Sequence, residues 1–106
     1  MNPNAAQAEL ARLRDAIDRV DEVLVKLLNQ RAKYAVEIGA IKGVLSLPVY
    51  APEREKEVLQ HVKSTSQGPL DGVTVRRLFE RIIDESRRVE REVAQSRAGR
   101  EHPWSS

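Results

Sequence analysis

The chain has 106 residues, enough for one domain with a limited core. Its net charge is only +2, with acidic and basic residues interspersed, so charge gives no reason to expect binding to nucleic acid or to a membrane. The absence of cysteine excludes a disulfide framework and a thiol nucleophile. There is no apolar run long enough for a signal peptide or a membrane span, and we therefore expect a cytoplasmic protein.

The apolar residues are almost all aliphatic, and aromatic residues make up only 4% of the chain, which favours an all-α fold. Long stretches without proline predict helices, and proline or glycine clusters predict the loops between them. Pro52 and the acidic residues after it suit the first turn of a helix. The predicted helices cover residues 6–44, 52–64 and 73–96, and the loops cover residues 46–52 and 64–72. They form a helical domain over residues 9–97, between a flexible N-terminus (1–8) and a disordered tail (98–106).

The first predicted helix carries an apolar stripe that is interrupted by a cation. Apolar residues recur at steps of three and four, but one step falls on Arg31, and Lys42 lies about 20° away around the helix and about 16 Å along it. A buried arginine is costly unless an anion meets it, so we expect both cations to face one interior. An ion pair of Arg31 with Glu37 or Asp21 is the alternative. The stripe consists of Leu10, Leu13, Ile17, Val20, Leu24, Leu27, Tyr34, Ile38, Ile41 and Leu45.

This stripe is too long for the two shorter helices to cover. The simplest partner for the remainder is a second copy of the same chain, so the sequence predicts an intertwined homodimer. The alternative is an antiparallel coiled coil without any site.

The third predicted helix carries two polar residues, Ser86 and Glu90, at successive inward positions. Ser86 alone would be explained by a bond to the preceding turn, and Glu90 alone by a pair with Arg87 or Arg91. The whole set of polar residues instead indicates a small, cation-rich pocket. That set consists of Arg31, Lys42, Arg54, Glu55, Ser86 and Glu90.

Six segments together resemble the all-α chorismate mutases, and the resemblance extends over residues 9–93. It implies three helices per chain, a dimer with the long first helices side by side, and two equivalent active sites. It also implies the rearrangement of chorismate to prephenate without metal, cofactor or covalent intermediate. The segments are 13–21 (LRDAIDRVD), 27–31 (LLNQR), 36–42 (VEIGAIK), 48–49 (PV), 53–55 (ERE) and 78–86 (LFERIIDES).

The resemblance implies how the two carboxylates of chorismate are bound. Arg14 would reach one carboxylate from the partner chain, and Arg31 would bind the other from its own chain, because forked donors hold a carboxylate in a fixed geometry. Arg54 would add positive field at the mouth of the pocket. Ser86 would lie beside the ring carboxylate.

It also implies how the reaction is accelerated. Lys42 would donate to the ether oxygen, which becomes negative as the C–O bond breaks, and Glu55 would accept a hydrogen bond from the ring hydroxyl. Glu90 stands where many relatives have glutamine, whose amide donates a second hydrogen bond to that oxygen. Because only a protonated carboxyl can donate, we expect activity to rise as the pH falls below neutrality. Ala51 also departs from the family, since bacterial relatives have an aspartate near the substrate hydroxyl.

Three other interpretations remain. Residues 50–54 (YAPER) also resemble the loop of the isochorismate pyruvate lyases, although residues 84–86 and Glu90 favour the mutase. A non-catalytic helical dimer could meet an acidic partner or nucleic acid through the arginines of the third helix, but interleaved acidic residues favour a solvated face. Finally, a larger enzyme of the same pathway could activate the chain, with the arginine-rich end of the chain and Trp104 in the tail as contact points.

Overall fold

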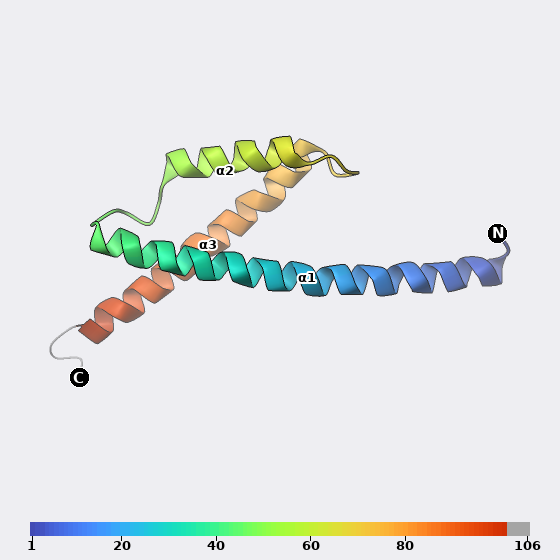
Figure 1. The fold of residues 1–106 in the computed structure, drawn as a ribbon, viewed down its shortest axis with the longest axis horizontal. Helices are drawn as coiled ribbons and strands as arrows, with labels where there is room; N and C mark the ends of the chain where they lie inside the picture. Colours follow the sequence, from blue (N-terminus) through green and yellow to red (C-terminus); the bar gives the residue numbers. More distant parts are fainter. Residues whose placement is uncertain (102–106) are drawn as a thin grey trace. The chain divides into compact units, whose positions relative to one another are not determined.

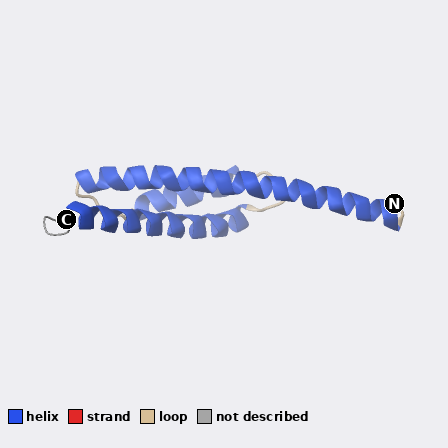
Figure 2. Ribbon diagram, turned by 90° about the horizontal axis from the view of Figure 1, so that it is seen from below, coloured by secondary structure: helices blue, strands red, loops and turns tan. Residues whose placement is uncertain are grey.

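The computed structural model describes residues 1–101, and the side chains of residues 1–96. This part of the chain contains three helices and no strand. Figures 1 and 2 show the course of the helices. The helices are α1 (Pro3–Val44), α2 (Pro52–Thr65) and α3 (Gly72–Glu101). The all-α prediction is confirmed. The chain divides into two units, Met1–Arg31 and a second that begins at Ala32, so α1 contributes to both.

Helix α1 begins at Pro3, earlier than predicted, so most of the segment 1–8 that we expected to be flexible is helical. The reason is an N-terminal cap. The side chain of Asn2 accepts a hydrogen bond from the Ala5 amide at 2.8 Å, and its carbonyl accepts one from Ala6 at 2.9 Å. Proline fits the first helical position because its missing N–H would have had no partner there.

Helix α1 ends in a tight reversal at Ser46, whose φ is 56°. The amide of Leu47 donates to the Lys42 carbonyl at 2.8 Å, and the amide of Ser46 donates to the Gly43 carbonyl at 3.3 Å. These two bonds form the Schellman arrangement that closes many helices, here with serine at the left-handed position that glycine usually takes. The cap therefore places Lys42 where the chain leaves α1 for the loop that carries Val49.

Helices α2 and α3 pack against each other in the second unit (Figure 1). Gly72, the first residue of α3, lies so close to α2 that an added Cβ atom would be 2.7 Å from the Lys63 carbonyl oxygen. Asp71 caps α3 by accepting a hydrogen bond from the Thr74 amide at 2.8 Å. Helix α3 extends to Glu101 rather than ending at residue 96. The rest of the predicted tail, residues 102–106 with Trp104, lies outside the described residues.

Few side chains of the single chain are buried. Among residues 1–96, only Ala35, Ile83 and Glu90 are buried, and none of them belongs to the first unit. The stripe on α1 is exposed, with Ile17 at 57% and Ile41 at 59%. Apolar surface of this extent marks an interaction site. No helix in residues 1–101 is both long and apolar enough to cross a membrane.

The close contact between Gly72 and α2 leads to a prediction about the free energy of unfolding. Gly72→Ala should lower the free energy of unfolding by about 1–3 kcal/mol, because the backbone of Lys63 must move to admit the methyl group. Urea denaturation measures this difference. Gly68→Ala is the matched control, since nothing lies within 4 Å of the added Cβ atom there. Equal stability of the two variants would contradict the close approach.

The cap of α3 leads to a prediction about how the free energy of unfolding depends on pH. Hydrogen bonds from the amide and hydroxyl of Thr74 hold the pKa of Asp71 below its usual value. The folded pKa is therefore lower than the unfolded one, so the carboxylate stabilises the fold at neutral pH and loses this effect as the pH falls through the folded pKa. Unfolding free energies of wild type and Asp71→Asn should differ at pH 7 and converge toward pH 3. A constant difference across this range would contradict the proposed charge effect.

Candidate active site

The most buried polar residue in the described side chains is Glu90 of α3, which is 7% exposed. The ammonium nitrogen of Lys42 on α1 lies 3.5 Å from Glu90 Oε2. The same nitrogen donates a hydrogen bond to the Val49 carbonyl at 2.8 Å. One cation therefore links the end of α1, the following loop and α3. The sequence analysis offered Arg87 or Arg91 as the partner of Glu90. This prediction is wrong, because the partner is Lys42.

The Glu90 side chain packs closely against α1, but one of its carboxyl oxygens lacks a hydrogen bond. An added Cβ atom on Gly39 would lie 3.5 Å from Glu90 Cγ, so a glycine of α1 faces the aliphatic part of this side chain. Oε2 is buried and has no hydrogen-bond partner, although Lys42 is within ion-pair distance. A buried polar atom without a hydrogen bond costs free energy, and a ligand that supplied a donor or acceptor would recover it. This carboxyl group is therefore suited to contact with a polar ligand.

A second polar cluster surrounds Arg87 of α3. Its Nε lies 3.1 Å from Glu55 Oε2 on α2, and its Nη2 lies 2.5 Å from Asp84 Oδ1 on α3. Its guanidinium carbon lies 5.1 Å from the centre of the Tyr50 ring. The side chains of Arg87 and Glu55 are half-buried. The sequence interpretation missed Arg87 and Tyr50 as parts of this cluster, although Arg87 follows Ile83 by one helical turn and precedes Glu90 by three residues, which places all three on one face.

The remaining predicted residues are placed differently. Ser86 is half-buried and donates to the Ile82 carbonyl at 3.0 Å, as its structural explanation predicted. Arg54 is 71% exposed and pairs with Glu57 of its own helix at 3.3 Å. Arg14 is exposed and Arg31 is half-buried, and both belong to the first unit. The second unit thus brings together Lys42 with Glu90, and Glu55 with Arg87, while the roles of Arg14, Arg31 and Arg54 stay predictions.

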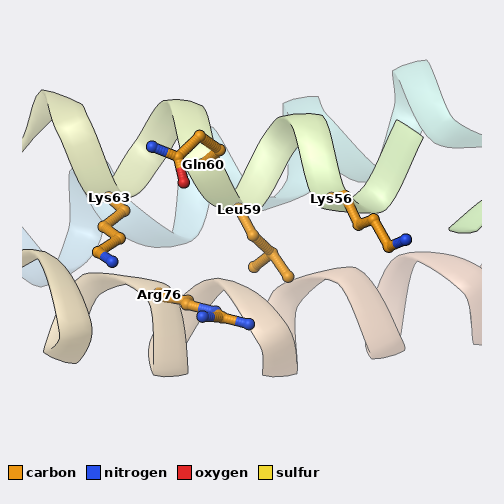
Figure 3. Close-up of a pocket in the computed structure, with 5 residues that line it drawn as sticks. All are labelled: Lys56, Leu59, Gln60, Lys63 and Arg76. Atoms are coloured by element: carbon orange, nitrogen blue, oxygen red, sulfur yellow. The ribbon is translucent and has the colours of Figure 1, made fainter. Parts of the chain in front are cut away.

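A hollow of about 190 Å³ lies elsewhere on α2 and α3. Figure 3 shows the residues that line it. The hollow contains none of the predicted site residues, and two of its three cations are already paired along their own helices. Lys56 lies 3.6 Å from Glu53, and Arg76 lies 3.4 Å from Glu80. These contacts weaken its attraction for an anion, so we do not assign the site to it. The hollow is lined by Lys56, Leu59, Gln60, Lys63 and Arg76.

Within residues 1–96, no three carboxylate or histidine side chains gather where they could hold a metal ion. The polar groups that the second unit does gather are an ammonium, a guanidinium and three carboxyl groups, all on helices. Such groups can bind a polar anionic ligand and stabilise charge that develops on it, without a nucleophile. The fold and this set of groups define a class of helical proteins with a polar, charge-bearing interior.

Comparison with known proteins identifies the family. The model of the family described as chorismate mutase type II matches residues 13–91. The chain therefore belongs to the chorismate mutase type II family, as the sequence resemblance predicted.

Individual relatives agree with this assignment. A bifunctional chorismate mutase/prephenate dehydratase of Neisseria gonorrhoeae is 44% identical over 78 residues, which are 74% of this chain and 21% of that protein. One from Aquifex aeolicus is 45% identical over 65 residues, which are 61% of this chain and 18% of that protein. The chain thus spans about a fifth of the length of these curated relatives.

Solved structures agree with the fold. A chorismate mutase from Thermus thermophilus superposes with a TM-score of 0.76 at 35% identity, covering 78% of this chain and 94% of that one. A chorismate mutase from Helicobacter pylori in complex with prephenate gives a TM-score of 0.76 at 28% identity, covering 83% of this chain and 96% of that one. The all-α fold with three helices is therefore that of the family.

Proposed function

We propose that this chain converts chorismate to prephenate by an intramolecular rearrangement. The observation that carries this proposal is the pair of Lys42 and Glu90, which places a cation and a buried carboxyl group together in the interior of a chain of this family. The H. pylori relative, whose structure holds prephenate, gives further support. The reaction breaks one C–O bond and forms one C–C bond within the same molecule, so it needs no cofactor and no acid, base or nucleophile.

Lys42 acts on the charge that develops as the C–O bond breaks. The ether oxygen becomes more negative in the transition state than in the substrate, so a cation beside it lowers the barrier selectively. The ammonium group of Lys42 is already held by the Val49 carbonyl at 2.8 Å, which fixes its position before substrate binds. The ether oxygen takes a further N–H of this group.

Glu90 donates the second hydrogen bond to the ether oxygen. A carboxylate accepts only, so the side chain must carry a proton when chorismate is bound. The position of Glu90 supports this role, because its Oε2 lies 3.5 Å from the Lys42 ammonium nitrogen, so both groups can reach one oxygen of the substrate.

The remaining contacts follow from the family motif. Arg31 binds one carboxylate of chorismate and Arg14 of a second copy binds the other, Arg54 adds positive field, and Ser86 lies beside the ring carboxylate. Glu55 accepts the hydrogen bond of the ring hydroxyl. The uncovered stripe on α1 supports a homodimer, because a single chain leaves side chains such as Leu27 and Ile38 about half exposed.

The first test is chorismate consumption by wild type, Lys42→Ala and Arg31→Ala. We expect each variant to lose at least about 10²-fold in kcat/KM, because each removes a charged contact to the reacting dianion. Lys33→Ala, on an exposed residue of the same helix, is the control and should retain wild-type activity. Dimeric variants of Lys42 and Arg31 with unchanged activity would contradict the proposed site. Formation of salicylate and pyruvate from isochorismate, without prephenate from chorismate, would favour the lyase instead.

The second test is the pH dependence of kcat/KM. If Glu90 must be protonated, the wild-type rate should rise as the pH falls below neutrality. Glu90→Gln should be nearly independent of pH in this range and faster than wild type near pH 7, because its amide donates without a proton from solution. A flat wild-type profile, together with unchanged activity of Glu90→Gln at pH 7, would refute the proposed role.

A further inference from the structure

Arg87 is a half-buried cation of the second unit that the proposed mechanism does not use. We propose that Arg87 is a positioning residue, which holds the Glu55 carboxylate and the loop before α2 in place for the substrate hydroxyl. This inference rests on the proposed function, because Glu55 is the expected acceptor of that hydroxyl.

The first support is that Arg87 joins three separate parts of the second unit. Its Nε lies 3.1 Å from Glu55 on α2, its Nη2 lies 2.5 Å from Asp84 on α3, and its guanidinium carbon lies 5.1 Å from the centre of the Tyr50 ring in the loop. Nε is buried and lacks the geometry of a hydrogen bond, so its contact with Glu55 is an ion pair. Exposures of 25% for Arg87 and 21% for Glu55 reduce screening of this pair by solvent.

The second support is that these contacts require arginine in particular. Different nitrogens of one planar group meet two carboxylates, while the central carbon of the same group lies over an aromatic ring. A lysine at position 87 has a single ammonium nitrogen on a flexible stem. It could pair with Glu55 or Asp84, but it could not reproduce the fork and the ring contact together.

The third support is the location of Glu55 itself. It lies in the first turn of α2, directly after the loop, so its position depends on how the loop is held. Two cations hold adjacent residues of this loop: Lys42 binds the Val49 carbonyl, and Arg87 contacts the Tyr50 ring. Arg87 engages Oε2 of Glu55. This contact leaves the other carboxylate oxygen, Oε1, to accept the hydrogen bond of the substrate hydroxyl. Without Arg87, Glu55 would lose the partner that fixes its rotamer.

The neighbouring Arg88 provides a matched control. Its side chain is 58% exposed and pairs with Glu85 at 2.7 Å and Glu92 at 2.8 Å, both on α3. Exposed pairs along one helix contribute little to stability, and this one makes no contact with α2 or the loop among the ion pairs of the described residues. Arg88→Met therefore changes the same residue type on the same helix without touching the Glu55 cluster.

The test is a double-mutant cycle measured with chorismate. Arg87→Met should raise KM about tenfold and change kcat by less than about twofold, because the hydroxyl contact is made in both the substrate and the transition state. In a Glu55→Ala background the same substitution should change KM by less than about twofold. Arg87→Lys, which keeps the positive charge, should recover only part of the loss, and Arg88→Met should match wild type.

The alternative outcomes are distinct. A merely structural role would lower the amount of active protein, and hence the apparent kcat, with KM unchanged. Equal effects of Arg87→Met in both backgrounds, wild-type KM in Arg87→Lys, or equal losses in Arg87→Met and Arg88→Met would each overturn the proposal while the wild-type enzyme remained active. A wild-type protein without mutase activity would refute the proposed function, and this inference with it.

Discussion

The interaction on which the rest of the second unit depends is the ion pair between Lys42 and Glu90. It places a carboxyl group with 7% exposure opposite an ammonium group at 3.5 Å, at the contact of α1 with α3. A buried pair of this kind is weak evidence for stability, because removing two charges from water costs about as much as their attraction returns. The presence of this pair is better explained by the proposed function, since the pair keeps a cation and a carboxyl group together in the interior before any ligand binds.

Around this pair, the loop between α1 and α2 is held from both sides. The Schellman arrangement at Ser46 turns the chain, Lys42 binds the backbone at Val49, and Arg87 contacts the ring of Tyr50. The loop leads directly into the first turn of α2, where Glu55 lies. The two cations therefore connect both polar clusters through one short segment, and a change at either cation should be transmitted to Glu55.

Much of the fold follows from local features of the sequence. Proline and glycine located both loops, and the spacing of apolar residues identified three helices, because these features act through nearby backbone geometry. The N-terminal boundary was misjudged because Asn2 and Pro3 look like a frayed end until Asn2 is recognised as a cap. The sequence prediction ended α3 at residue 96, which was too early. Residues 97–101 contain no strong helix breaker apart from Gly99, so the helix continues to Glu101.

The site was harder to predict than the helices. Spacing on one helix placed Ser86 and Glu90 on a common face, but it could not show that Glu90 pairs with Lys42, because that choice depends on how α1 packs on α3. Arg87 was counted among the solvated arginines for the same reason, since its partners Glu55 and Tyr50 lie far away in the sequence. Pairs within one helix are predictable from sequence, and pairs between helices require the packed structure.

The most direct test of the role of Lys42 and Glu90 is a crystal structure of the protein with a transition-state analogue of the rearrangement. Both the Lys42 ammonium and the Glu90 carboxyl group should lie within about 3 Å of the ether oxygen of the analogue. An analogue bound elsewhere, or one whose ether oxygen contacts neither group while Lys42 and Glu90 remain paired with each other, would contradict the proposed active site.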